Sequence, residues 1–126
     1  MLCEGLYSLL SGSAELTAII GNRITPAVLP KNPTFPAITF QQISDRTTVN
    51  LDGSATNVVR IEIDCWAQTY LAAAQAQKAL HDLLDGYTGT LSDGTVVKYT
   101  GSMQGPDIFE HDSLLFRTSV DFFFTL

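Results

Sequence analysis

The chain has 126 residues, a length that fits one folded domain, and 45% of them are hydrophobic, which is enough for a core without disulfides or metals. Thirteen acidic against seven basic residues give a formal net charge of −6, and the bases are spread singly, which argues against tight binding to nucleic acid. The charged fraction of 16% is low for a soluble domain, so a partner is expected to cover part of the surface.

The cysteines and the start of the chain indicate an intracellular protein without a membrane anchor. Cys3 and Cys65 form no CxxC pair, so free thiols in a reducing compartment are expected. The apolar start has no Lys or Arg before it and is interrupted by Glu4, which is not typical of a signal peptide. No apolar run approaches the roughly 20 residues of a membrane-spanning helix.

The first third of the chain predicts two short helices followed by irregular chain. Leucines within residues 2–10 recur at helical spacing, and Gly12 ends that helix. Ser13 is a candidate N-cap for a second helix, which Gly21 closes. Four of the five prolines fall within residues 25–36, so this segment is expected to be extended irregular chain laid over the domain.

Strand patterns follow from Ala37. Residues 37–44 alternate, and so, more clearly, do residues 58–66. Between them lies a polar stretch, residues 45–57, which contains the turn signal Asp52-Gly53. We therefore predict a hairpin with an unusually long polar arm, and long loops in compact domains are commonly functional.

The second half predicts one long helix and then strands. Thr69 is the N-cap candidate of a helix that Asp85-Gly86 ends, and alanines on its apolar face allow close packing on a sheet. A tight hairpin is predicted around Ser92-Asp93-Gly94, a second polar loop at residues 101–113, and a long antiparallel strand at residues 114–126. This order predicts a single α+β domain over residues 1–126, an antiparallel sheet with helices packed on one face.

The sequence contains no constellation typical of catalysis. His81, His111 and Cys65 are interpreted as surface or core residues, and no phosphate-binding glycine loop or HExxH pattern is present. The acidic residues of the 101–113 segment lack the spacing of a calcium loop. We therefore predict a protein that is not an enzyme, with no catalytic residues, no cofactor and no metal.

The order and content of the segments carry more information than any one motif. The ordered motifs are a helical pair ending in Gly21-x-Arg23-Ile24, prolines leading to Pro36-Ala37-Ile38-x-Phe40, a strand ending in Asp64-Cys65-Trp66-Ala67 before a Thr69-Tyr70 helix start, and Val120-Asp121-Phe122 in the last strand. This series resembles the tail-completion, or tail-terminator, proteins of long-tailed bacteriophages. The resemblance covers Leu2 to Phe124.

The resemblance implies a structural virion protein of a phage or prophage. It would cap the tail tube at its head-proximal end and join the tail to the head connector, as a hexameric ring. The implied partners are further copies of the chain, the tail tube protein and a head-tail connector or stopper protein, while DNA passes through without specific binding. The implied location is the virion tail, with assembly in the host cytoplasm and no membrane contact.

Two sets of residues are candidates for contacts within such a particle. The candidates for contact with a neighbouring subunit or the tail tube, most of them on the polar arm, are Asp45, Arg46, Asp52, Gly53, Arg60 and Glu62. The candidates for a lumen or head-facing loop are Asp107, Glu110 and Asp112.

Alternatives remain open from the sequence. One is a head-side neck protein or a minor tail protein of the same fold. Another class is a small cytoplasmic α+β ligand-binding domain or enzyme, which would need an apolar cavity with convergent polar groups. A third is a dimeric interaction module without a role in a virion.

Overall fold

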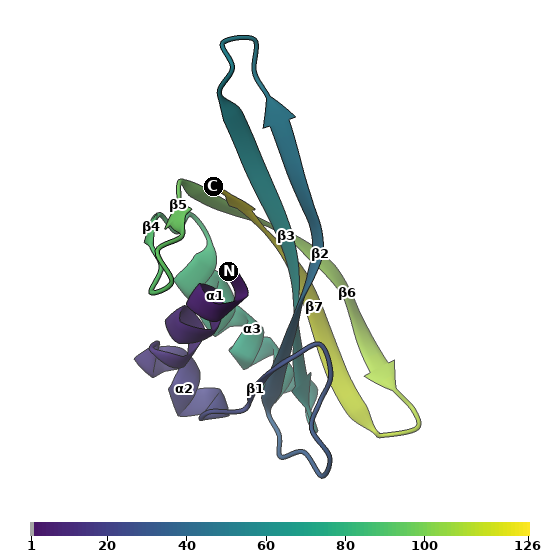
Figure 1. The fold of residues 1–126 in the computed structure, drawn as a ribbon. Coiled ribbons are helices and arrows are strands. Elements are labelled where there is room, and N and C mark those ends of the chain that lie inside the picture. Colours follow the sequence, from purple (N-terminus) through teal and green to yellow (C-terminus); the bar gives the residue numbers. More distant parts are fainter. Residues whose placement is uncertain (1) are drawn as a thin grey trace.

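The computed structural model describes residues 2–126, which form three helices, a five-stranded sheet and a two-stranded sheet (Figure 1). The helices are α1 (Leu2–Ser11), α2 (Ala14–Ile20) and α3 (Tyr70–Leu84). The strands of the large sheet are β1 (Ile24–Pro26), β2 (Ala37–Val49), β3 (Ala55–Ala67), β6 (Tyr99–Glu110) and β7 (Leu115–Thr125). The small sheet pairs β4 (Gly89–Thr90) with β5 (Val96–Val97).

The large sheet has the order β1-β2-β3-β7-β6. All neighbours in it are antiparallel except β1, which pairs parallel with β2. The α+β prediction is confirmed, with the correction that the sheet is mixed rather than purely antiparallel. Figure 1 shows the three helices on one side of the sheet and no helix on the other.

The core lies between the helices and the sheet. On β3 the alternation is as predicted, because Val59, Ile61, Ile63 and Cys65 are all buried. The helices contribute leucines and small alanines to the same core, and β7 contributes aromatic side chains. The buried residues that fill it from the helices and β7 are Leu2, Leu6, Leu10, Leu16, Ile20, Ala76, Ala79, Leu80, Leu84, Val120, Phe122 and Phe124.

The predicted helix boundaries are confirmed. The hydroxyl of Ser13 accepts a hydrogen bond from the backbone N–H of Leu16 at 3.3 Å, and Thr69 accepts one from Ala72 at 3.2 Å. Each bond satisfies a donor that the first turn of a helix leaves unpaired. Gly21 follows α2 with φ of 58°, a conformation that glycine adopts at low cost.

The proline-rich segment is only partly irregular. Residues Ile24–Pro26 form β1 and pair with β2 in the register Ile24↔Ile38 and Pro26↔Phe40, which corrects the prediction for the start of this segment. Burial of Ile24 against the core favours this pairing. Proline is tolerated there because β1 is an edge strand, where an N–H can be missing without breaking a ladder.

The polar stretch at residues 45–57 is largely strand rather than loop. The β2–β3 ladder continues from Asp45↔Val59 to Val49↔Ala55, and only residues 50–54 form the turn. The side chains of this part of β2 are exposed, so the burial alternation that reveals a strand in sequence is absent. The predicted long arm is therefore a two-stranded hairpin, which projects beyond the body of the domain in Figure 1.

The predicted polar loop at residues 101–113 is also wrong in its secondary structure. Strand β6 runs through Glu110, and the turn to β7 occupies residues 111–114. The prediction of a loop rested in part on Gly105-Pro106, residues that are unusual inside a strand. In the structure they lie at an irregularity in the β6–β7 register, between Gln104 and Asp107. An edge strand accommodates proline at such a bulge.

Candidate interaction surfaces

The projecting hairpin, residues 43–57, carries four of the six predicted contact residues. Asp45 and Arg46 lie on its β2 strand, and Asp52 and Gly53 lie in its turn. Each strand residue advances about 3.3 Å, so residues 43–49 place the turn roughly 20 Å beyond Gln42. Within residues 2–126, Arg46 has no ion-pair partner, so its charge is available to another molecule.

The other two predicted contact residues, Arg60 and Glu62, lie elsewhere, on the open face of the sheet. This open face is the side of β3 and β7 that the helices leave uncovered. The Nε of Arg60 donates to Oδ2 of Asp121 at 3.0 Å, and the Ser119 hydroxyl donates to Oε1 of Glu62 at 3.1 Å. The structure thus divides the predicted set between two surfaces.

Arg117 connects the remaining charges of the open face. Its Nη1 lies 3.6 Å from Oδ2 of Asp64, and its Nη2 lies 3.4 Å from Oε1 of Glu110. The guanidinium also stacks over the ring of Trp66, with Cζ at 5.2 Å from the ring centroid. Trp66 in turn donates from Nε1 to the hydroxyl of Thr39 at 2.9 Å. Sequence reasoning missed this network, because its members come from four strands.

The network on the open face is incomplete within one chain. Burial raises the pKa of Asp64 to about 6, and the neighbouring carboxylate of Glu62 acts in the same direction. Among the described residues, Oδ1 of Asp64 and Nε of Arg117 are buried without a hydrogen-bond partner. Buried polar groups are ordinarily paired, so the hydrogen-bonding capacity of these two atoms, which lie beneath the surface of the open face, is unused in this arrangement of the side chains.

The end of the β6–β7 hairpin holds the second predicted set. Asp107 accepts a hydrogen bond from the Tyr70 hydroxyl at 2.8 Å, Glu110 lies beside Arg117, and Asp112 is exposed in the turn. The structure therefore brings these carboxylates to one end of the sheet but not into one cluster. Within residues 2–126 no group of three or more His, Cys, Asp or Glu side chains is arranged to hold a metal ion.

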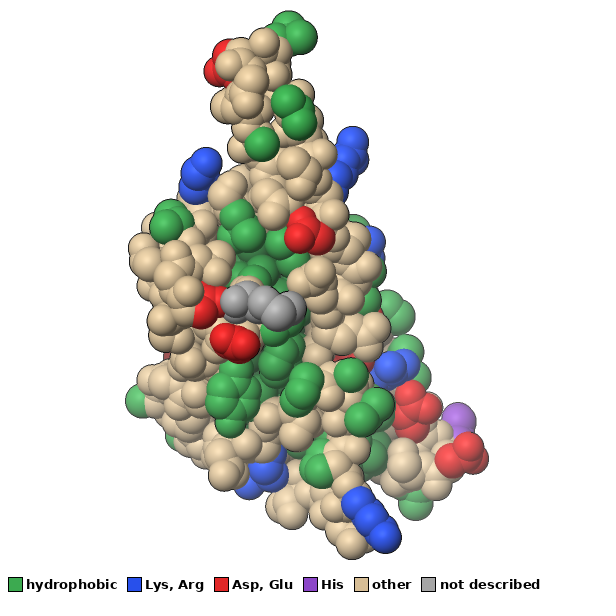
Figure 2. Space-filling view, viewed as in Figure 1, with side chains coloured by type: hydrophobic (Ala, Val, Ile, Leu, Met, Phe, Trp, Pro, Cys, Tyr) green, Lys and Arg blue, Asp and Glu red, His purple; other side chains and the backbone are tan. Residues whose placement is uncertain are grey.

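An apolar groove lies between α1 and the β1–β2 edge of the sheet. The α1–β2 groove has a volume of about 630 Å³, and Cys3, Tyr7, Pro26, Ala27 and Phe40 form its apolar lining. Figure 2 shows hydrophobic side chains gathered in this hollow. One feature of the sequence could have indicated this groove. Cys3 and Tyr7 are apolar, lie one helical turn apart, and stand beside the stripe of buried leucines.

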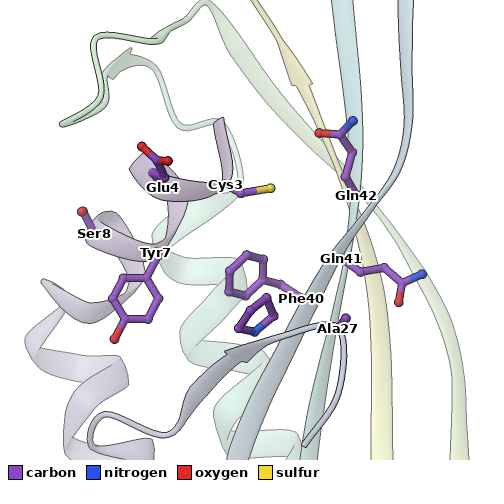
Figure 3. A pocket seen from close by; sticks show the side chains of 9 residues that line it. Cys3, Glu4, Tyr7, Ser8, Ala27, Phe40, Gln41 and Gln42 are labelled. Atoms are coloured by element: carbon purple, nitrogen blue, oxygen red, sulfur yellow. The ribbon is translucent and has the colours of Figure 1, made fainter. Parts of the chain in front are cut away.

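The polar side chains at the α1–β2 groove do not converge. In Figure 3, Glu4 and Ser8 point away from Phe40 on the helix side, while Gln41 points toward the opposite side of β2. A small-molecule site ordinarily has a few polar groups directed at one ligand. The groove is therefore better suited to an apolar side chain of another protein than to a small polar substrate.

The remaining candidate reactive groups have structural surroundings. Burial raises the pKa of the Cys65 thiol to about 12, which disfavours a thiolate nucleophile. Nδ1 of His81 lies 2.8 Å from Oδ2 of Asp85, the C-cap residue of α3, and the His81 ring packs near Phe122. Among residues 2–126, no helix has the length and apolar character that a membrane crossing requires.

The open sheet face, the projecting hairpin and the apolar groove are the features of a structural, partner-binding protein. The sequence profile of the family described as tail completion protein gp17 matches residues 4–125, so the chain belongs to this family of structural phage tail proteins. The resemblance inferred from the ordered motifs is confirmed. The protein is thus a phage tail-completion protein and a component of the virion.

The fold agrees with that of a chain in a solved particle. The structure described as "Virion of native gene transfer agent (GTA) particle" contains a chain that superposes with a TM-score of 0.74 at 17% sequence identity. The match covers 95% of this chain and 90% of that chain, so the two share the whole fold. No curated protein sequence matches the chain.

Proposed function

We propose that the protein forms a ring of six copies that caps the tail tube at its head-proximal end and joins the tail to the head connector. The observation that carries this proposal is the projecting hairpin, whose residues 43–57 extend beyond the body of the domain. Residues 43–57 contribute no buried side chain to the core, and they reach surfaces that the compact body does not. Its contacts are with further copies of the chain or with the tail tube protein.

The open face of the sheet supports assembly independently. The uncovered face of the sheet carries partly exposed charged groups, such as Arg60 and Glu110, with which a covering protein can pair. A ring needs a contact between two different patches that repeats until it closes. The hairpin and the open face are different patches of one chain, as such a contact requires.

The negative net charge of the chain suits a ring through which DNA passes. With a net charge of −6 and dispersed bases, the chain repels phosphates rather than retaining them. DNA then passes through the ring without specific binding. The β6–β7 end, with Asp107, Glu110 and Asp112, is assigned in this proposal to the lumen or to the surface that meets the connector or stopper protein.

Electron microscopy of particles that lack the gene tests the proposal. Full heads separated from tails, with tails of irregular length, are the expected result, and the wild-type gene supplied in trans should restore joined particles. Joined particles of normal tail length in the absence of the gene would contradict the capping and joining role.

A shortened hairpin tests the observation that carries the proposal. Residues 47–57 are replaced by Asn-Gly, which joins the cross-strand partners Arg46 and Val58 through a two-residue turn. We expect this variant to fold, since the core is untouched, but not to restore joining. Unfolding by urea, compared with wild type, serves as the control for folding. Restored joining would show that the hairpin is dispensable.

A further inference from the structure

The end of the projecting hairpin presents apolar side chains that its own chain does not bury. Leu51 is fully exposed in the turn, and Val49 beside it is 71% exposed. Singly exposed apolar residues are common on protein surfaces. Two neighbouring ones at the far end of a roughly 20 Å projection are instead placed to enter a cavity of another molecule.

The turn holds these side chains in a fixed geometry. The Asn50 N–H donates to the carbonyl of Ser54 at 2.7 Å, and Oδ1 of Asp52 accepts from the Ser54 N–H at 2.9 Å and from its hydroxyl at 2.6 Å. Gly53 provides the positive φ of 86° that the turn requires. A preorganised turn loses little conformational freedom when it docks.

The α1–β2 groove is the complementary feature. Its floor is the ring of Phe40, and its apolar walls come from Cys3 and Tyr7 on one side and Pro26 and Ala27 on the other. A volume of about 630 Å³ is enough for a hairpin turn to insert a leucine with a neighbouring valine.

The hairpin of the same chain does not reach this groove. Gln42 lines the groove and is also the residue from which the hairpin departs. From there the β2–β3 ladder continues through Val49↔Ala55, which directs the turn away from the groove. The occupant is therefore in another molecule.

Charge is consistent with a second copy as that molecule. Glu4 lies at the groove, and Arg46 lies on the hairpin five residues before Leu51. Neither has an ion-pair partner within residues 2–126, and their charges are opposite. Both charges are exposed, so their pairing would aid orientation more than affinity.

We propose that the projecting hairpin of one copy inserts Leu51, with Val49 beside it, into the α1–β2 groove of a second copy. In the proposed ring the hairpin of each copy docks into the groove of the next copy, a heterologous contact that repeats until the ring closes. This inference rests on the self-assembly in the proposed function and names the contact that produces it. Because the contact buries the side chain of Leu51, the Leu51→Ser substitution should weaken the association of two copies roughly 10- to 100-fold per interface.

The native thiol of Cys3 allows a direct test. The Leu51→Cys chain is oxidised under mild conditions in assembled particles and as the purified protein, and it is then separated on a non-reducing gel. Burial raises the pKa of the Cys3 thiol, so oxidation is performed at alkaline pH, where the thiolate forms. We expect covalent multimers larger than dimers, because each chain would offer one thiol on the hairpin and one in the groove. Reductant should return them to monomers.

Two control variants separate this contact from others. Leu51→Cys combined with Cys3→Ser leaves the hairpin thiol as the only accessible one, because Cys65 is buried in the core. Tip-to-tip contact would still give dimers in that variant. Leu114→Cys places a thiol at another exposed leucine, at the other end of the sheet, where no groove contact is expected. Both controls should give no multimers larger than dimers.

The outcomes distinguish this inference from the function on which it rests. If assembled particles contain the protein at the tail end but the Leu51→Cys chain gives no multimers beyond dimers, the hairpin–groove contact is wrong while the capping role stands. If the protein is absent from the tail end, the proposed function itself fails. Multimers larger than dimers in the variant with both Leu51→Cys and Cys3→Ser would also overturn the contact, since they would not involve the groove thiol.

Discussion

At the scale of single residues, Asp64 is an acidic side chain that the fold largely buries. Its carboxylate lies on the open face between Glu62 and Arg117, only 13% of the side chain is exposed, and burial raises its pKa to about 6. In the unfolded chain the pKa of an aspartate is about 3.9. The folded protein therefore binds this proton more tightly than the unfolded chain does.

The sign of the pH dependence follows from this difference. A raised pKa contributes stability that is fully present below about pH 4 and is lost as the pH rises through about 6. Asp64→Asn does not titrate in this range, so from pH 4 to pH 7 its free energy of unfolding should rise relative to wild type by about 2–3 kcal/mol. Urea unfolding at pH 4, 5, 6 and 7 measures the difference.

The control for this prediction is Asp112→Asn, which removes the same formal charge from an exposed turn outside the network. If the curves of Asp64→Asn and wild type run parallel from pH 4 to pH 7, the raised pKa of Asp64 is refuted. Assembly that covers the open face and pairs Arg117 would change this behaviour, so the measurement belongs on the unassembled chain.

At the scale of the element, the long helix α3 depends on a single capping hydroxyl. Thr69 accepts a hydrogen bond from the Ala72 N–H at 3.2 Å, and α3 packs its alanines onto β3 and β7. Thr69→Ala removes the cap and should lower the free energy of unfolding by roughly 0.5–2 kcal/mol. Gln68→Ala, at the neighbouring exposed position, is the matched control and should leave stability nearly unchanged. Equal losses in both variants would contradict the capping role.

The elements also show where sequence patterns suffice. Caps at Ser13 and Thr69 were predictable because capping is local, and β3 and β7 were predictable because one face of each packs on the core. The outer half of the β2–β3 hairpin has no buried face, so its strands lack the alternation that identifies them. In β6 the bulge at Gly105-Pro106 shifts the alternation halfway along the strand.

The candidate interaction surfaces were only partly predictable, for a related reason. That Asp45 and Arg46 lie on a projecting segment was predictable, because a polar insertion in a compact domain is visible in sequence. The α1–β2 groove combines α1 with β1 and β2, and the Arg117 network combines several strands. Such surfaces depend on which elements become neighbours, and that is set by the topology of the sheet rather than by local spacing.

At the scale of the whole molecule, the distribution of charge bears on the passage of DNA through the proposed ring. The chain carries 13 acidic and seven basic residues, and Arg60, Lys78 and Arg117 are held in ion pairs with acidic neighbours. Phosphate binding depends on available Lys and Arg. The intact chain should therefore leave DNA mobile, and the carboxylates at the β6–β7 end should contribute to that property if this end faces the lumen.

Reversing charge at the β6–β7 end tests this property in the particle. Glu110→Lys combined with Asp112→Lys changes the formal net charge from −6 to −2, since each reversal adds two units. If this end faces the lumen or the head, the variant should retain DNA or block joining, and infectivity should fall by on the order of tenfold or more, as clustered charge alters encounter rates.

The neutral pair Glu110→Gln and Asp112→Asn is the matched control, because it removes the same carboxylates without adding cations. Its defect should be smaller, and higher salt during DNA ejection should reduce the difference by screening. Unchanged infectivity of the reversed variant would place this end of the sheet away from both the DNA path and the head.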